Sequence, residues 1–560
     1  MAENSRQIHI VGAGIAGLAA AVFAIRDGKI PGRNIHIYEE GRDQDAQHGG
    51  NSTGGALDAT QVANKGFVMR GGRMFEEKYL CTYDFLSEIP SYDDKSISAA
   101  EDIFRFTKEA GWRATARLLD ANGGVLNVRS MGFDWGDRFA LLRLLLTLDE
   151  KKLSRKRIDE VLPDHFFDSH FWQMWCTMFS FQPWHSAIEM RRYLLRFIHL
   201  FPQIADLSCV YHTRYDQFHS IVLPVIEWLK AQGVDFQKGV AVVDMEFGEP
   251  NSGGQYRVAS LTRCSSDDAS SDVVALGEKD VVLVTNGSMT DAAILGDWDN
   301  PAPLKADVSA AWSLWRRLAK KRKGSFGDPE AFIRKVEQSK WLSFTVVTNS
   351  SKFSDHLFRL TGRTFGREGL ITFKRSSWFM TIHPHFAPVY PGHDGAKEFI
   401  WWGYGLRPDN TGDFIAKKMA DCSGKELLEE ALRQLRVDDA TFAEVMDPKH
   451  STCIPCMMPY ITSQFMPRDP GDRPPVRPVG SENLAFVGQF AEIEKDVVFT
   501  VEYSVRTAKA AIKSLIDSEI EVPPMYEGYR NLRELAAAGW ISVRPAWWPF
   551  FSNTSRTGDA

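Results

Sequence analysis

The stretch QIHIVGAGIAGLAAAVFAIRDG, residues 7–28, decides the fold. It opens with a short β-branched run, turns at residues 12–14 and continues as an apolar, alanine-rich segment. Its glycines at 12, 14 and 17 have the GxGxxG spacing. Because this spacing follows a strand and opens a helix, it predicts the nucleotide-binding turn of a Rossmann-like domain.

Each glycine of this turn has a physical role in holding a pyrophosphate. The first permits the tight turn, the second lets the phosphates approach the backbone, and the third lets the helix pack on the strand. The helix N-terminus is then aimed at the phosphates. A second strand, NIHIYEE, ends near a glutamate whose carboxylate can bind the ribose hydroxyls. We therefore expect nucleotide contacts from Gly12, Gly14, Ala16, Gly17 and Glu39.

The stretch MRGGRMFEE, residues 69–77, favours FAD over NAD. Its bare glycine backbone between two arginines resembles flavoproteins related to amine oxidases and phytoene desaturases, where such a backbone runs beside the flavin. Two later segments agree: 280–290 is typical of a strand and turn, and 482–515 of a strand, a turn and a helix. FAD is the expected cofactor, with further contacts from Ser288, Gly488 and Thr500.

Changes of pattern divide the chain into segments. Apolar residues at helical spacings dominate 100–210, β-branched and aromatic runs dominate 330–410, and the connector 467–480 is proline-rich. We expect an α/β protein with two parts. The first is a Rossmann-like FAD-binding domain built from discontinuous segments, namely 1–100, 211–300 and 481–520. The second is a substrate domain with a β-sheet and helical insertions, namely 301–480 and 101–210, followed by a helical and aromatic tail, 521–560.

Composition and charge exclude several classes of protein. A net charge of −6 provides no polyanion-binding surface, so we expect no nucleic acid partner. Seven scattered cysteines are typical of a reduced, cytoplasmic enzyme, and the CIPC pair lacks the further ligands of a metal site, so no metal is expected. No apolar run reaches the roughly 18 residues of a membrane-spanning helix. The aromatic tail could dock on the body of the protein or touch a membrane surface, and we favour docking.

Several separated segments together resemble the oleate hydratases, also called myosin-cross-reactive antigens. The segments are GAGIAGLAAAVFAIRDG, RGGRMFE, FWQMWCTMFSFQPWHSAIEMRRYLLRFIH, TNGSMT, PYITSQFMPR and VGQFAEIEKDVVFTVEYSVRTA. The resemblance implies addition of water to the cis-9 double bond of oleic acid, giving 10-hydroxystearic acid. It also implies bound FAD without net redox change, because the flavin of this family shapes and polarises the site and works best when reduced.

The resemblance assigns residues around the flavin. The family's arginine and glycine motif falls on Arg70, Gly71, Gly72 and Arg73, which we expect beside the cofactor. The next residue is Met74, where the family has the glutamate credited with holding and activating water. The resemblance therefore implies that Met74 lies at the catalytic centre without the chemistry of a carboxylate.

Substrate contacts follow from the resemblance and from the residues themselves. The tyrosine thought to protonate the alkene matches Tyr193, and residues near the substrate carboxylate match Gln217 and Thr381. Thr381, His383 and His385 alternate along one stretch, so they can share one face of a strand. That face could anchor the carboxylate of a fatty acid.

Hydration of an unactivated alkene needs a proton donor at one carbon and water at its neighbour. A tyrosine, with a pKa of about 10, is too weak an acid alone. Arg73 could stabilise its phenolate, and a reduced flavin could stabilise the developing cation. Alternatively, Tyr193 packs in the core with its hydroxyl satisfied. For His185 we favour a structural role at a helix start that Ser186 could cap.

Without the glutamate, two ways of holding water stay open. Glu76 or Glu77 could supply the carboxylate, although a shift of two residues moves the side chain along the backbone, away from the position of Met74. Alternatively, backbone carbonyls and the flavin hold the water, and Tyr193 contributes more of the catalysis. We favour this second possibility.

Three functional classes remain. The first, which we favour, is a fatty-acid hydratase with FAD. The second is a flavin oxidase or desaturase acting on a lipid or isoprenoid, and the third is a fatty-acid binder that has lost catalysis. The first strand begins near Gln7, without the long leading segment of the family's dimers, so we expect a monomer.

Overall fold

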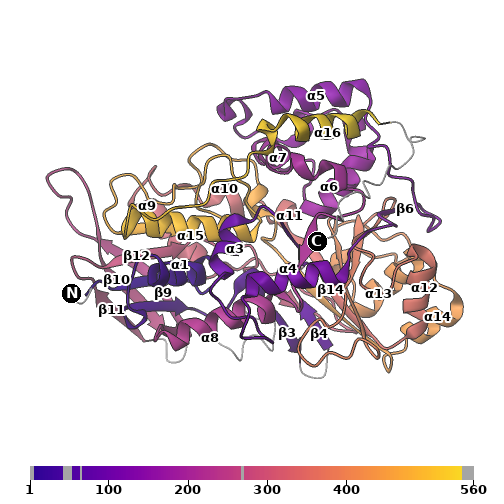
Figure 1. The fold of residues 1–560 in the computed structure, drawn as a ribbon, viewed down its shortest axis with the longest axis horizontal. Helices are drawn as coiled ribbons and strands as arrows, with labels where there is room; N and C mark the ends of the chain where they lie inside the picture. Colours follow the sequence, from indigo (N-terminus) through magenta and orange to yellow (C-terminus); the bar gives the residue numbers. More distant parts are fainter. Residues whose placement is uncertain (1–4, 42–52, 63–65, 73, 266–269, 545–560) are drawn as a thin grey trace, which may run out of the picture.

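The computed structural model describes residues 5–41, 53–62, 66–72, 74–265 and 270–544. Five parallel strands form one sheet in the order β19-β12-β1-β2-β8 (Figure 1). They are β1 (Ile8–Val11), β2 (Ile35–Glu39), β8 (Asp235–Lys238), β12 (Val281–Thr285) and β19 (Leu484–Val487). One sheet therefore gathers strands from both ends and the middle of the chain.

The parallel sheet forms because the strand at its centre, β1, and the strand at one edge, β19, are buried on both faces. β1 (IHIV) is buried along its whole length, and so is β19 (LAFV). Such continuous apolar runs need cover on both sides. Three helices pack against one another along the sheet, and a three-stranded antiparallel sheet lies against β2. The helices are α1 (Ile15–Arg26), α8 (Leu223–Ala231) and α15 (Val501–Leu515), and the strands are β9 (Val240–Phe247), β10 (Val258–Ser265) and β11 (Ser271–Ala275).

A second sheet has seven strands in the order β13-β18-β14-β17-β16-β15-β6, antiparallel except for the pair β15 and β6. Helices α12, α13 and α14 cover its outer face (Figure 1). The strands are β6 (Leu118–Leu119), β13 (Ile294–Leu295), β14 (Trp341–Thr348), β15 (Ile371–Phe373), β16 (Met380–Pro384), β17 (Phe399–Gly405) and β18 (Ser451–Met458). The helices are α12 (Ser351–Thr361), α13 (Gly424–Gln434) and α14 (Asp439–Val445).

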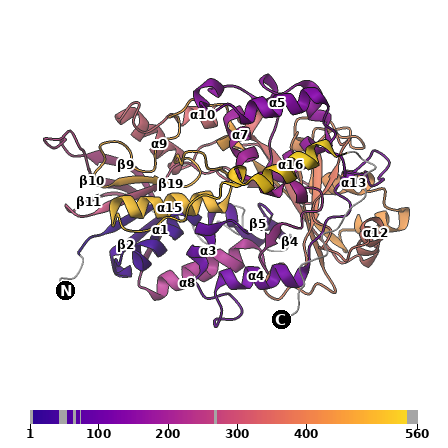
Figure 2. The ribbon, with the colours of Figure 1, turned by 45° about the horizontal axis from the view of Figure 1, so that its top comes forward.

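The remaining helices lie along the two sheets and above them. Figure 2 shows α16, from the end of the described chain, running beside α5 and α7. The helices are α3 (Leu80–Leu86), α4 (Ala99–Ala110), α5 (Trp135–Leu145), α6 (His170–Phe179), α7 (Ala187–Arg196), α9 (Ala310–Lys321), α10 (Glu330–Ile333), α11 (Val336–Ser339) and α16 (Leu532–Val543). The short strands form two antiparallel pairs: β3 (Ala59–Val62) with β4 (Gly66–Met69), and β5 (Met74–Glu76) with β7 (Val210–His212).

The α/β class predicted from the sequence is confirmed. β12, β19 and α15 lie within the segments predicted to carry strands and a helix, and residues 467–480 contain neither. β6 and β13 join the second sheet from outside residues 301–480. Each has two residues, too few to show the alternation that predicts a strand. No helix among the described residues is long and apolar enough to cross a lipid bilayer.

Candidate functional site

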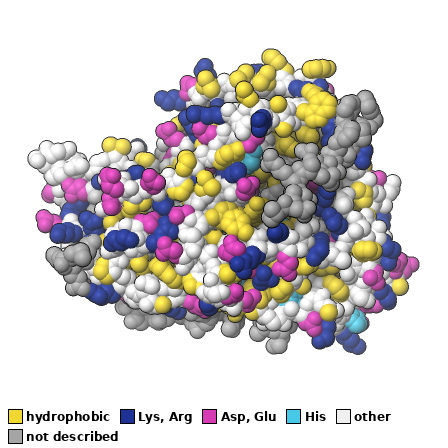
Figure 3. Space-filling view, viewed as in Figure 1, with side chains coloured by type: hydrophobic (Ala, Val, Ile, Leu, Met, Phe, Trp, Pro, Cys, Tyr) yellow, Lys and Arg dark blue, Asp and Glu magenta, His cyan; other side chains and the backbone are white. Residues whose placement is uncertain are grey.

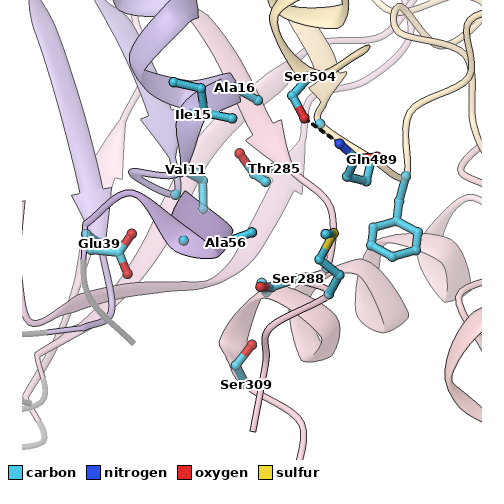
Figure 4. Close-up of a pocket in the computed structure, with 18 of the residues that line it drawn as sticks. Val11, Ile15, Ala16, Glu39, Ala56, Thr285, Ser288, Ser309, Gln489 and Ser504 are labelled. Carbon is cyan, nitrogen blue, oxygen red and sulfur yellow. Dashed lines mark hydrogen bonds between the residues drawn. The ribbon is translucent and has the colours of Figure 1, made fainter. Parts of the chain in front are cut away.

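The carboxyl ends of the parallel strands open onto a cavity, the outer cavity, with about 1210 Å³ of empty space including open solvent (Figure 4). Its lining comes from the ends of β1, β2 and β12, the start of α1 and the segment before α15. This edge is where parallel sheets bind their ligands. The predicted residues that line it are Gly12, Gly14, Ala16, Glu39, Ser288, Gly488 and Thr500.

The N-terminus of α1 faces the outer cavity without a capping side chain. Its N-cap is Gly14, and the first turn has no acidic residue. A Cβ at Gly14 would meet no protein atom within 4 Å. The free N–H groups of this turn can therefore bind an anionic phosphate that approaches the backbone closely.

Gly17, by contrast, does not line the cavity. A Cβ there would lie 2.1 Å from the Gly12 carbonyl oxygen and 3.1 Å from a methyl group of Ile10. Gly17 thus allows α1 to pack tightly on β1, which is the packing role expected of the third glycine.

Glu39 lies at the carboxyl end of β2, with its carboxylate braced by the turn. Its Oε2 accepts a hydrogen bond from the Ala13 N–H at 2.8 Å, and its Oε1 accepts one from the Gly41 N–H at 3.0 Å. Burial raises the pKa of Glu39, and these two N–H groups oppose the rise. Each oxygen keeps a lone pair, so the carboxylate can also accept from the hydroxyls of a ribose.

Thr285, at the end of β12, was not predicted. It lines the outer cavity, and its buried hydroxyl has no hydrogen-bond partner among the described residues. Figure 4 shows it between the β1 turn and the C-terminal segment, where the Gln489 amide donates to Ser504 Oγ at 2.8 Å. An open helix N-terminus and a braced carboxylate thus face one space, with Thr285 beside them, and this arrangement fits a dinucleotide.

A second cavity, the inner cavity, adjoins the outer one and holds about 1150 Å³ of empty space including open solvent. Six residues line both cavities: Ala56, Leu57, Met289, Phe499, Thr500 and Val501. The predicted residues that line it are Arg70, Gly71, Gly72, Met74, Tyr193 and Gln217. Arg73 lies outside the described residues. A Cβ at Gly71 would meet no protein atom within 4 Å, so this backbone is open to a bound group.

The rest of the inner lining is mainly apolar, as a hydrocarbon chain requires. A smaller cavity of about 230 Å³ shares four of its lining residues and extends it between α6 and the segment after α7. The shared residues are Met178, Phe179, Phe197 and Leu200. No regular spacing in the sequence predicts that these residues lie together, or that Trp341 and Trp402 of the second sheet lie beside them.

Tyr193, on α7, is fully buried, and its hydroxyl donates to the carbonyl of Val498. Burial raises its pKa well above the usual value, while the charge of Arg473 acts in the opposite direction. The ring packs against Phe179, Phe181 and other aromatic side chains. This hydrogen-bonded hydroxyl agrees with the alternative interpretation of the sequence, in which Tyr193 packs in the core. Tyr193 nevertheless also lines the inner cavity.

Buried ion pairs hold α7 in place. Glu189 lies 2.9 Å from Arg468 and 3.1 Å from Arg473, and Arg192 lies 2.6 Å from Glu492. Four of these five side chains are at most 4% exposed, and Glu492 is 15% exposed. Because such charges are costly unless paired, their geometry fixes the helix that carries Tyr193.

Met74 begins β5, and its side chain lines the inner cavity. Glu76, on the same strand, is the only carboxylate among the described residues that line this cavity. It lies 2.9 Å from Arg196 and 3.5 Å from His199, and it accepts from the Lys78 N–H at 2.7 Å. Burial opposes its ionisation, but His199 and Arg196 outweigh that, so its pKa is lowered. Glu77 is largely exposed and lines neither cavity.

Thr381 and His383 are buried on β16 but line neither cavity. They pair in register with Tyr404 and Trp402 of β17, which do line the inner cavity. The rings of His383 and His385 lie 4.5 Å apart, consistent with one shared face. These predicted anchors are therefore one strand removed from the lining.

His185 has the structural role favoured from the sequence. It is buried, its Nδ1 accepts from the Gln182 N–H at 3.0 Å, and burial lowers its pKa to about 3. Ser186 is the N-cap residue of α7, but its side chain makes no capping hydrogen bond, so the prediction of a serine cap was wrong. The nearby ion pairs stabilise this helix instead.

Comparison with known proteins gives the family. The MCRA family profile matches residues 5–512. The chain belongs to the MCRA family. It is 34% identical over 542 residues to the oleate hydratase of Streptococcus pyogenes serotype M49 (strain NZ131), covering 96% of this chain and 89% of that protein. It is 34% identical over 535 residues to the linoleate hydratase of Lactiplantibacillus plantarum, covering 90% of this chain and 92% of that protein.

The resemblance drawn from the sequence is thereby confirmed. Among solved structures, putrescine oxidase bound to putrescine matches this MCRA family member with a TM-score of 0.51 and 11% identity, covering 91% of this chain and 98% of that one. At this identity the likeness shows a shared fold.

Proposed function

We propose that this MCRA family protein is an FAD-binding fatty-acid hydratase, which adds water to the cis-9 double bond of oleic acid to give 10-hydroxystearic acid. The observation that carries the proposal is the junction of the two cavities. One fits a dinucleotide and the other a hydrocarbon chain, and Tyr193 lines the second. The oleate and linoleate hydratases cited above support the same reaction.

In this proposal the outer cavity holds FAD. The first turn of α1 binds the pyrophosphate, Glu39 binds the ribose, and Thr500 lies where the cofactor passes between the cavities. The open backbone of Gly71, with Gly72 next to it, would hold the flavin ring, and Arg70 would add positive charge, as the sequence also predicts for Arg73. When bound and reduced, the flavin supplies electron density that stabilises positive charge developing on the alkene.

The chain's own residues then perform the hydration. The apolar lining excludes bulk water and binds the acyl chain. Gln217 contacts the carboxylate of the fatty acid, and Thr381 and His383 lie one strand behind the lining. Burial keeps Tyr193 protonated, and the carbonyl of Val498 orients its hydroxyl. Tyr193 gives this proton to one alkene carbon, water bonds to the neighbouring carbon, and a proton of water restores the phenol.

Product analysis tests the proposal. Purified protein is incubated with oleate, FAD and a reductant, and the products are analysed by mass spectrometry. Addition of one water to oleate is expected. Oxygen consumption or a new double bond would instead support a flavin oxidase or desaturase, and tight oleate binding without turnover would support a fatty-acid binder.

We further propose that the protein touches membranes only peripherally. Apolar side chains recur on one face of α5 and just beyond it, and others are exposed on the neighbouring α16 (Figure 3). They are Trp135, Phe139, Leu142, Leu146, Leu532 and Trp540. Sedimentation with anionic lipid vesicles tests this contact, and Trp135→Asp should weaken it.

The tail beyond residue 544 lies outside the described residues. A monomer in the cytoplasm stays a prediction, which light scattering and cell fractionation can check.

A further inference from the structure

Tyr79 lines the inner cavity, and its hydroxyl has no hydrogen-bond partner in the part of the chain that the structure describes. It is the N-cap residue of α3, reached by a tight turn from β5, and it is 7% exposed. Three tyrosines line the inner cavity within the described chain: Tyr79, Tyr193 and Tyr404. The hydroxyl of Tyr193 donates to the Val498 carbonyl, and that of Tyr404 donates to the Thr177 carbonyl. The hydroxyl of Tyr79 makes no hydrogen bond to any described residue.

The surroundings of Tyr79 keep it a neutral hydroxyl. Burial raises its pKa, and the charge of Glu76 raises it further. Glu76 itself is already engaged by Arg196, His199 and the Lys78 N–H, as described above. The one carboxylate among the described lining residues is therefore already held by three partners, whereas the Tyr79 hydroxyl has a donor and two acceptor sites to offer.

Tyr79 also lies within electrostatic reach of Tyr193. After burial, the largest influence on the pKa of Tyr193 comes from Tyr79. Both rings line the same cavity, Tyr79 from the β5 side and Tyr193 from α7. A small molecule bound to Tyr79 therefore lies in the space where the proton donor acts.

We propose that Tyr79 Oη holds the water that attacks the alkene. As an acceptor it takes one hydrogen bond from this water, which leaves a lone pair of the water oxygen directed into the cavity. In the balanced reaction, Tyr193 gives a proton to one alkene carbon, the water oxygen bonds to the other, and one water proton replaces the proton that Tyr193 lost. Tyr79 gains and loses nothing, and no electrons are transferred. This role rests on the proposed hydratase function.

Tyr79→Phe tests the role. Since the hydroxyl has no partner in the described chain, its removal should leave FAD content and thermal stability unchanged. The rate constant kcat for oleate hydration should fall about tenfold or more, with KM unchanged, because water loses its positioning group. Tyr83→Phe is the matched control. Tyr83 lies one turn further along α3, is also buried and donates to the Glu76 carbonyl at 3.0 Å, so kcat should persist.

A double variant separates this role from a structural one. If Tyr79 holds water, a carboxylate introduced by Met74→Glu should take over, and Tyr79→Phe with Met74→Glu should recover much of the lost kcat. A wild-type kcat in Tyr79→Phe, a lowered melting temperature, or no recovery in the double variant would each overturn the proposal. If the wild-type protein itself forms no hydroxy acid, the hydratase function fails instead.

Discussion

The outer and inner cavities adjoin, but they are built from different kinds of structure. The outer cavity is formed by backbone turns and small residues where parallel strands end, so its shape depends on main-chain geometry. The inner cavity is formed by large side chains from α7, β5 and the second sheet, held by buried ion pairs. We infer that the first binds a common cofactor and that the second determines the reaction.

The largest expected effect tests the backbone side of this comparison. Gly17→Val places a side chain where even a Cβ would lie 2.1 Å from the Gly12 carbonyl oxygen. The turn then has to move, so we expect loss of FAD and of all activity. The flavin absorbance of the purified variant measures this. Retention of FAD would mean that the turn adapts and that main-chain geometry is less decisive than inferred.

Tyr193→Phe should affect the inner cavity alone. Hydration should fall by about 10²- to 10⁴-fold, the range for loss of a general acid, while FAD and oleate still bind. Turnover assays beside oleate titrations separate the two effects. Substantial remaining activity would remove Tyr193 from the acid role.

Acid should lower the thermal stability of the protein, because it protonates a carboxylate in the ion pairs that hold α7. Burial opposes ionisation of Glu492, but Arg468, Arg192 and Arg473 outweigh it and lower the pKa from 4.5 to about 2. A carboxylate with a lowered pKa contributes stability above pH 4.5 that is lost as the pH falls towards 2. Thermal unfolding followed across this range should show a falling midpoint.

The matched variant for the acid test is Glu492→Gln. Breaking a buried pair costs about 3 kcal/mol, so its midpoint at neutral pH should be lower. Between pH 4.5 and 2, the unfolding midpoint of this variant should change less with pH than the midpoint of the wild type does. An unchanged pH dependence would show that other carboxylates control the acid transition.

The smallest effect is expected at Met74, where the lining is apolar. Met74→Glu should leave hydration unchanged or raise it, provided that the new carboxylate faces the same space as Met74 does now. Steady-state kinetics and FAD content measure the outcome. Loss of FAD binding would indicate a loop rebuilt around methionine, and the two cavities would then be less independent than their linings suggest.

The sequence by itself determined the outer cavity in most of its parts. The glycine spacing, the glutamate ending β2 and the strand and helix near the C-terminus could all be predicted, because local backbone requirements leave a local pattern. Membership of the family followed from several such stretches taken together. The engaged state of Glu76 and the unpaired hydroxyl of Tyr79 left no pattern of this kind.

Several residues of the inner cavity were predicted from the sequence, but only the tertiary structure decided how its lining is assembled. Tyr193 meets Val498 across more than half the chain, and Glu189 meets Arg468 and Arg473 from a distant connector. The tertiary structure also placed Thr381 one strand behind the lining of the inner cavity rather than in it. The physical reason is that side chains converge here from elements that are distant in sequence. Their contacts depend on how whole helices and sheets pack, which no local period records.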